Sequence, residues 1–208
     1  HPELFKRDGT LKAEYLKAQD VIARMESDEL YSLLMSGQKQ VIRTGFIAGV
    51  PFKIKIDSLL DGDTCRKIAE RFPKAQAALI HDGAIVDQKA MRDMAAVWSE
   101  EDRCRLPFVE AWGYDTQGAI YQAVDGHMLP FILAVGTKED SPDLSALYIS
   151  DEDLAAKLHE VEDLAPRYQA IKEGRIQPTR CEHCAYCRAT KRLDAILNYK
   201  DLNTDDWL

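Results

Sequence analysis

Three charged side chains have the types and positions of a metal site for phosphodiester hydrolysis. Asp57 follows an alternating segment typical of a β-strand, and Asp87 and Lys89 close another such segment. Because side chains alternate between the two faces of a strand, Asp87 and Lys89 share one face. Two carboxylates can hold Mg²⁺ or Mn²⁺, and the main-chain carbonyl of Gln88 is a third candidate metal ligand. We therefore expect these residues to meet at one rim of a sheet.

The expected chemistry is divided between the metal and the lysine. A bound divalent metal lowers the pKa of a water molecule and stabilises charge on the phosphoryl oxygens. Lys89, beside two carboxylates and a phosphate, stays protonated, so we expect it to position the water and stabilise developing charge rather than remove a proton. An Asp-x-Lys triplet alone is a weak signal, because a solvated ion pair at a strand end has the same pattern.

A second pair of polar side chains follows on a predicted helix. Gln117 and Tyr121 are four residues apart and therefore share one helix face. A glutamine amide can bond a phosphate or a base edge, and a tyrosine ring can stack on a nucleotide, which makes both residues candidates for substrate binding. The structural alternative is a half-buried tyrosine beside a capping glutamine.

Three of the five cysteines lie within seven residues, at positions Cys181, Cys184 and Cys187. This spacing is typical of metal ligation in a reducing compartment and not of a secreted disulfide framework. The sequence therefore predicts a metal-binding staple in the C-terminal segment, with a structural and not a catalytic role.

The occupant of the cysteine cluster is open on sequence grounds. Zinc would take the three thiolates together with His183 or another nearby donor. A [4Fe-4S] cluster would take them with a distant cysteine, Cys65 or Cys104. Three reduced thiols in a packed turn are the third alternative. If Cys65 and Cys104 bind no metal, we expect them to be small buried apolar residues within helical segments.

Composition bounds the class of protein. The 208 residues are 46% hydrophobic and 30% charged, as in a soluble globular domain. The net charge of −8 argues against wholesale wrapping of nucleic acid but is compatible with a local site. No apolar run reaches the roughly 20 residues that cross a bilayer, and no secretion signal opens the chain, so we expect no membrane and a cytoplasmic location. Because His1 and not methionine comes first, we also expect that a segment upstream of it is missing.

Hydrophobic periodicity predicts a mixed order of helices and strands. Helices are expected as a consecutive pair over 11–38 capped at Ser27 and Asp28, and over 65–72, 90–103, 108–124 and 150–171, the last capped by Ser150. Strands are expected over 41–47, 50–56, 77–80, 84–89, 131–135 and 146–149. This order predicts an α/β fold with a small mixed central β-sheet flanked by helices. We expect a core over 1–173 and a cysteine-containing tail over 174–208 packed on it.

The motifs, taken in order, resemble those of the PD-(D/E)xK nuclease superfamily, in its RecB-like and RecE-like branch. They are Phe52–Asp57, Ala84–Lys89, Tyr114–Tyr121 with its Gln-x-x-x-Tyr pattern, and Cys181–Arg188, and the resemblance covers roughly Leu30 to Arg192. A phage-encoded group of RecE-like exodeoxyribonucleases also resembles the chain in its end, Cys181–Arg188. The resemblance implies a restriction-endonuclease-like core and Mg²⁺- or Mn²⁺-dependent exonuclease digestion of duplex DNA ends for recombination.

The same resemblance implies partners, and the sequence also departs from the family. The implied partners are DNA, a single-strand annealing protein and further copies of the chain in a ring or other homo-oligomer. Ala90 stands where the family has threonine, Asp87 where many members have glutamate, and the Gly-x-x-x-His helix of this branch is not in the sequence. Two alternative functions are a non-catalytic nucleic-acid or protein-binding module and an iron–sulfur nuclease of the CRISPR-adaptation type.

Overall fold

The computed structural model describes residues 2–79, 82–100, 102–182, 184–193, 196 and 198–201. It divides into two compact units, residues 1–166 and residues 167–208, which are described separately below. The first unit contains the sheet and most of the helices. Among the described residues, no helix is both long and apolar enough to cross a membrane.

The helices and strands have the following bounds. The strands are β1 (Gln38–Ile47), β2 (Val50–Asp61), β3 (Gly83–Met91), β4 (Val97–Ser99), β5 (Cys104–Leu106), β6 (Phe131–Thr137) and β7 (Leu144–Ile149). The α-helices are α1 (Ala13–Ser27), α2 (Glu29–Leu34), α3 (Gly62–Arg71), α4 (Phe108–Ala111), α5 (Tyr114–Asp125), α6 (Asp151–Lys172) and α7 (Ala185–Ala189). Short 3₁₀ segments are η1 (Pro2–Leu4), η2 (Pro73–Ala78) and η3 (Tyr199–Asp201).

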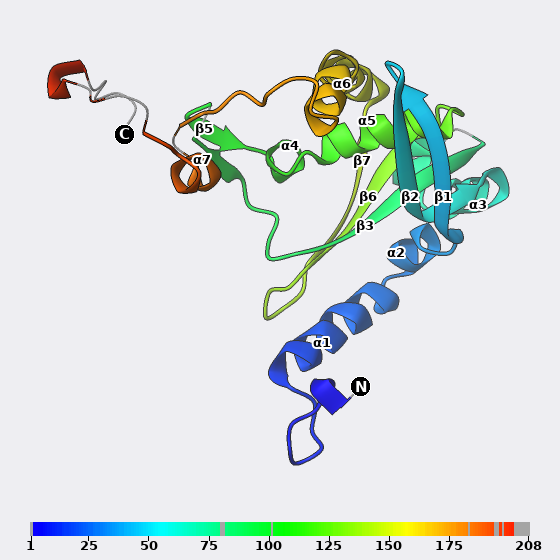
Figure 1. Cartoon of the computed structure of the whole chain (residues 1–208). Coiled ribbons are helices and arrows are strands. Elements are labelled where there is room, and N and C mark those ends of the chain that lie inside the picture. Colours follow the sequence, from blue (N-terminus) through cyan, green and yellow to red (C-terminus); the bar gives the residue numbers. More distant parts are fainter. Residues whose placement is uncertain are drawn as a thin grey trace. The chain divides into compact units, whose positions relative to one another are not determined.

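A five-stranded mixed sheet forms the centre of the first unit (Figure 1). Its strand order is β1-β2-β3-β6-β7. Strands β3 and β6 are parallel, with α4 and α5 in the connection between them, and the other neighbours are antiparallel. The predicted fold class, an α/β fold with a small mixed sheet flanked by helices, is confirmed.

Helices cover both faces of this sheet, as Figure 1 shows. Helices α1, α2 and α3 pack on the face that carries Ala84 and Val86 of β3. Helices α5 and α6 pack on the opposite face, which carries Ile85. All seven residues of β6 are buried, because both faces of this central strand are covered. The name "α5 face" is used below for the side that carries Ile85, and "α1 face" for the side that carries Val86.

Two predicted helix caps are confirmed. Asp28 accepts a hydrogen bond from the backbone N–H of Tyr31 at 2.9 Å, at the start of α2. The Ser150 hydroxyl accepts one from the N–H of Asp153 at 3.1 Å, at the start of α6. Each side chain satisfies a backbone donor that the first turn of a helix leaves without an intrahelical partner.

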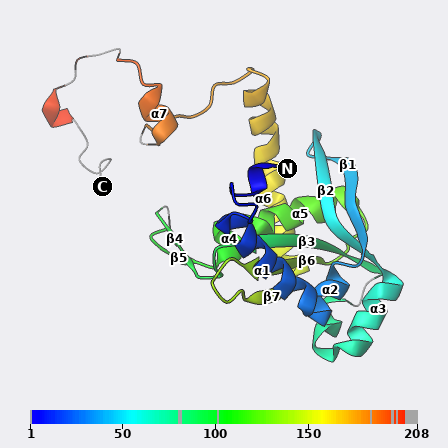
Figure 2. The same cartoon turned by 90° about the horizontal axis from the view of Figure 1, so that it is seen from below.

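The helix predicted over 90–103 is wrong. Strand β3 continues to Met91, and β4 and β5 then form a two-stranded hairpin, which Figure 2 shows beside α4. The β-branched and aromatic pair Val97-Trp98 favours a strand. The hydroxyl of Ser99 accepts the N–H of Asp102, and Arg103 has a positive φ of 52°, so the intervening segment turns back on itself.

Other predicted boundaries are also wrong. The strand expected over 77–80 is absent over 77–79, where Ala77 and Ala78 belong to the 3₁₀ segment that Pro73 opens, and Ile80 lies outside the described residues. Asp57 does not end its strand, because β2 continues to Asp61.

Helix α5 approaches the sheet closely at a glycine. A Cβ atom on Gly118 would lie 2.6 Å from Cδ1 of Phe131 and 2.9 Å from Cδ2 of Leu154. Both of these neighbours are fully buried. Glycine at this position therefore sets the spacing between α5 and β6.

We expect Gly118→Ala to lower the free energy of unfolding by about 1–2 kcal/mol, because overpacking outweighs the gain in helix propensity. Urea denaturation with an unchanged m-value measures this. In the Phe131→Leu background, where the smaller side chain leaves room for the added methyl group, Gly118→Ala should cost less stability than in the wild type. Wild-type stability of Gly118→Ala would show that the spacing adjusts without cost.

Candidate active site

The site is built where β2 and β3 separate. β3 pairs with β2 only from Gly83 to Val86, whereas it pairs with β6 from Ile85 to Met91. The β2-side edge of β3 is therefore open from Asp87 onward. This open edge is the feature around which the candidate residues gather.

Strand β2 loses its regular alternation just before this point. Ile56 packs in the cluster on the α5 face, whereas Leu60 packs on the α1 face. In a regular strand two residues four apart would share a face, so the alternation slips between them. Opposite the slip, Gln40 of β1 has a positive φ of 53°, and the regular pairing of β1 with β2 skips Gln40 and Asp57. A local irregularity of this kind re-aims a side chain in the way that a β-bulge does.

The slip turns the Asp57 carboxylate toward β3. Its Oδ1 accepts a hydrogen bond from Nε2 of Gln40 at 2.9 Å, and its Oδ2 accepts one from the backbone N–H of Gln88 at 3.0 Å. The N–H and C=O groups of a strand residue point to the same side of the strand. The carbonyl of Gln88 therefore points into the same gap as its N–H, as the predicted third ligand requires.

Asp87 and Lys89 lie on the α5 face and meet Gln117 from the first turn of α5. Asp87 is only 3% exposed. Its Oδ1 accepts a hydrogen bond from Nε2 of Gln117 at 2.7 Å, and its Oδ2 lies 2.6 Å from Nζ of Lys89. Lys89 Nζ also donates to Oε1 of Gln117 at 2.8 Å. One amide thus holds both members of the ion pair.

Burial determines the electrostatics of this group. Desolvation raises the pKa of Asp87 above its usual range, although the close contact with Lys89 and its positive charge oppose the shift. The negative charge of Asp57 raises the pKa of Asp87 further, and the Gln117 hydrogen bond lowers it. Two carboxylates close together at an open strand edge attract a divalent cation.

The donor set fits a hard divalent metal. Oδ2 of Asp87 is buried and, among the described residues, receives no hydrogen bond, because Lys89 contacts it as an ion pair without hydrogen-bond geometry. Buried polar atoms without such a partner are rare and are found where an ion binds. Asp57, Asp87 and the Gln88 carbonyl would supply three oxygen ligands, and Mg²⁺ completes its octahedron with water and substrate oxygens.

The structure adds residues that the sequence patterns did not single out. Lys89 Nζ lies 4.6 Å from the ring centroid of Tyr114, a cation–π contact. Tyr114 is three residues before Gln117 on α5, so helix periodicity could have identified it. Gln40, by contrast, faces Asp57 only because the β1–β2 pairing slips, and no spacing rule signals that.

Gln88 extends to the opposite face with its side chain. Its Nε2 donates to the hydroxyl of Tyr31 at 3.2 Å, and that hydroxyl donates to the carbonyl of Ala134 at 3.2 Å. Burial raises the pKa of Tyr31. Gln88 therefore contacts Asp57 through its backbone and the packed α1 face through its side chain.

The predicted substrate-binding roles of Gln117 and Tyr121 stay predictions. Gln117 uses both ends of its amide in the Asp87–Lys89 network. The Tyr121 hydroxyl donates to the carbonyl of Lys55 at 3.1 Å, and its ring makes an edge contact with Phe131 at 5.8 Å between centroids. Direct contact with a nucleotide would require either side chain to exchange these bonds.

In the second unit, the three predicted cysteines come together. The Sγ atoms of Cys181, Cys184 and Cys187 all lie within 4.8 Å of one another. Backbone N–H groups of Cys184 and Cys187 each donate to a neighbouring Sγ at 3.4 Å. His183, the nearest candidate for a fourth ligand, lies outside the described residues. Three soft donors this close fit a metal ion or cluster.

The other two cysteines differ from each other. Cys65 is fully buried in the core between α3 and the sheet, as predicted, and desolvation raises the pKa of its thiol to about 11. This disfavours Cys65 as a metal ligand, because thiols ligate metals as thiolates. The expectation for Cys104 is wrong: Cys104 is exposed on β5, since the segment forms a hairpin instead of a buried helix.

Comparisons with known proteins agree with this geometry. The model of a family described as "PDDEXK-like domain of unknown function (DUF3799)" matches residues 1–68 and 72–190. The crystal structure of a protein from Eubacterium rectale, described as a candidate exonuclease, is similar over 98% of this chain and 70% of its own, with a TM-score of 0.76 and 38% identity. A search of the curated proteins gave no match. The chain therefore belongs to the family of PDDEXK-like domains.

Proposed function

We propose that this chain is a metal-dependent DNA exonuclease that hydrolyses phosphodiester bonds from duplex ends. The observation that supports this most directly is the convergence of Asp57, Asp87 and Lys89 at the open edge of β3, where the buried Oδ2 of Asp87 has an ion pair with Lys89 but no hydrogen bond among the described residues. An ion pair with a purely structural role would not require the second carboxylate, Asp57, to turn toward the same gap.

Asp57, Asp87 and the carbonyl of Gln88 would hold Mg²⁺ or Mn²⁺. When bound, this metal supplies a water of lowered pKa and neutralises charge on the phosphoryl oxygens. The Asp57 carboxylate is held in place by Gln40 and by the N–H of Gln88, so it is oriented before any metal arrives. Preorganised ligands reduce the cost of ordering the site on binding.

Lys89 is placed to stabilise negative charge as it develops on the phosphate. Its side chain is 20% exposed, and its ammonium group lies between Asp87 and Gln117, above the ring of Tyr114. From this position Lys89 supplies positive charge to the phosphate. Gln117 and Tyr114 act through Lys89 and are positioning residues.

The finer parts of the proposal rest on the relatives. Action at DNA ends follows the description of the Eubacterium rectale protein as a candidate exonuclease. A role in recombination, a single-strand annealing partner and a homo-oligomeric ring follow the resemblance to RecE-like phage enzymes. The cysteine cluster of the second unit would hold zinc or a [4Fe-4S] cluster as a structural staple.

We expect Asp87→Asn and Lys89→Met each to lower the rate of linear duplex digestion with Mg²⁺ by about 10²–10³-fold, the loss typical when a group that stabilises transition-state charge is removed. Release of acid-soluble nucleotides measures the rate. Asp163→Asn, on the exposed side of α6, is the matched control and should match wild type. Closed circular duplex should resist digestion. Equal activity of wild type and Asp87→Asn would reject the enzyme and favour the binding module.

We expect Mn²⁺ to raise the midpoint of thermal unfolding of the wild type, because a ligand that binds only the folded state stabilises it by about 2.7 kcal/mol at 100 times its dissociation constant. Asp57→Asn and Asp87→Asn should lose this shift, and Asp163→Asn should keep it. The measurement needs no DNA and separates metal binding from catalysis. An undiminished shift in both variants would place the metal elsewhere.

We expect the purified protein to hold stoichiometric metal that Cys184→Ser loses, with a lower unfolding midpoint. Elemental analysis and visible absorbance measure this: a brown protein contains an iron–sulfur cluster, and a colourless protein with zinc does not. Tyr186→Phe, an exposed change on α7 that removes no candidate ligand, should retain the metal. Anaerobically prepared wild type without metal would show that the thiols are simply reduced.

A further inference from the structure

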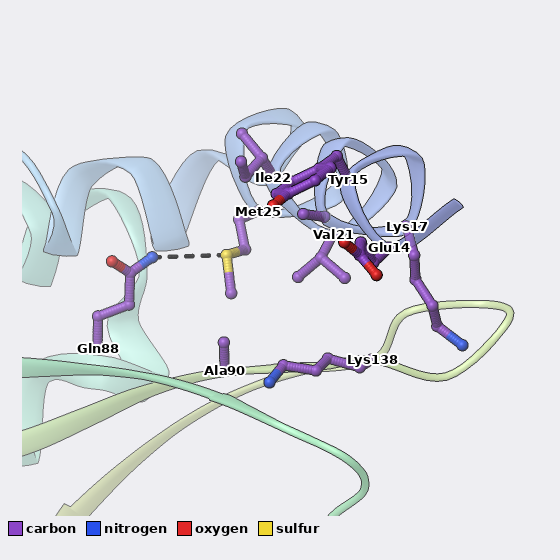
Figure 3. A pocket seen from close by; sticks show the side chains of 10 residues that line it. Glu14, Tyr15, Lys17, Val21, Ile22, Met25, Gln88, Ala90 and Lys138 are labelled. Atoms are coloured by element: carbon purple, nitrogen blue, oxygen red, sulfur yellow. Dashed lines mark hydrogen bonds between the residues drawn. The ribbon is translucent and has the colours of Figure 1, made fainter. Parts of the chain in front are cut away.

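A pocket of about 760 Å³ lies on the α1 face, between helix α1 and strand β3 (Figure 3). Val21, Met25 and Tyr15 line it from the helix, and Gln88 and Ala90 line it from the strand. Figure 3 shows the Gln88 side chain reaching toward the sulfur of Met25, 3.5 Å away. This volume is within the range of small-molecule binding sites. The name "α1 pocket" is used for it below.

The walls of the α1 pocket are mostly apolar, and its charged lining residues are of both signs. Val21 and Met25 are buried at its base. Lys17 and Lys138 line it as well, together with the acidic Glu14. Nζ of Lys17 forms an ion pair with Oδ1 of Asp140 at 3.3 Å, whereas Lys138 forms no ion pair within the described part of the chain. An apolar cavity edged by a free ammonium group suits a flat ring attached to an anion.

The pocket and the proposed catalytic edge share one residue. The backbone of Gln88 binds Asp57 and faces the metal gap, while its side chain is part of the pocket wall. Ala90 is two residues further along β3, about 6.6 Å, and on the same face. Because β3 has no partner strand on that side after Val86, nothing in the sheet separates the gap from the pocket.

The polar group in the wall is also suited to a heterocycle. Nε2 of Gln88 is directed to Met25 and Tyr31, and Figure 3 shows Oε1 on the side away from Met25, so Oε1 would meet a base only after the side-chain amide turns over. A glutamine side chain on a base edge is a common recognition contact. Tyr15 and Met25 supply faces on which an aromatic ring can stack.

We propose that the α1 pocket holds a nucleobase of the DNA strand being cut, from a nucleotide adjoining the scissile phosphate. This inference rests on the proposed nuclease function. The base enters the apolar cavity with its edge toward Gln88, and its phosphate lies at the mouth near Lys138. The backbone of the strand then runs along the open edge of β3, where Asp57 and Asp87 lie. The pocket thus selects an unstacked nucleotide, as at a frayed end.

The test compares duplexes that differ only in an abasic residue placed on either side of the terminal scissile bond. For the wild type, we expect an abasic residue at one of the two positions to raise the dissociation constant for DNA, measured without metal, about tenfold. The same residue should raise KM, measured with Mg²⁺, about tenfold, which is the size of one base's stacking contribution. The other position should have little effect. This comparison needs no variant, so it does not depend on how a substitution affects folding.

A matched pair of variants locates the effect. Ala18→Trp fills the pocket from an exposed position of α1, and Ala155→Trp makes the same change on the exposed side of α6. Ala18→Trp should weaken binding of intact DNA about tenfold and abolish the abasic effect, because both remove the same stacking contact. Ala155→Trp should behave as wild type.

The outcomes distinguish the pocket from the nuclease proposal. DNA digestion that is equally fast on intact and abasic ends, or a full abasic effect in Ala18→Trp, would overturn the pocket assignment and leave the nuclease proposal intact. Loss of discrimination in Ala18→Trp, with kcat close to that of the wild type, would support it. Binding discrimination with no digestion by the wild type would instead reject the nuclease proposal.

Discussion

The site depends on keeping one carboxylate charged inside the sheet. Asp87 is 3% exposed, and removing an ion from water costs several kcal/mol even after a protein relaxes around it. Lys89 supplies the opposite charge and Gln117 the hydrogen bond that offset this cost. Gln117 reaches Asp87 only because α5 lies close against β6, and that approach depends on the absent side chain of Gly118. The spacing of one helix is therefore linked to the ionisation of one side chain.

A partly satisfied charge inside a protein weakens the fold unless function requires it. Oδ2 of Asp87, which has the ion pair with Lys89 but no hydrogen bond among the described residues, is such a group, and the slip in β2 turns Asp57 toward the same strand. The two irregularities, one electrostatic and one in strand pairing, occur at the same place. Departures from regular structure concentrate at functional sites. Each one lowers the stability of the fold, and ordinary packing does not offset that loss.

Sequence patterns predicted the parts of this molecule that follow simple periods. The buried run of β6, the hairpin of β1 and β2, and the caps at Asp28 and Ser150 follow from burial and backbone hydrogen bonding. The shared face of Asp87 and Lys89 follows from the two-residue repeat of a strand. The hairpin at 97–106 was missed because apolar spacing in a short segment does not distinguish a helix from a strand. Gln40 was missed because its role arises from a tertiary contact, whereas Tyr114 lies at helix spacing from Gln117 and was overlooked.

The slip at Asp57 has a consequence for how such sites are recognised. In an unbroken strand, an acidic residue after Ile56 would point to the α1 face and away from Asp87 and Lys89. The informative feature of the sequence is thus the point where the buried positions on the α5 face shift from even numbers, Ile54 and Ile56, to an odd number, Leu59. In a distant homologue, an acidic residue at the position of Asp57 without this change of alternation would be a surface charge. An acidic residue at that position together with the change would indicate that the metal site is retained.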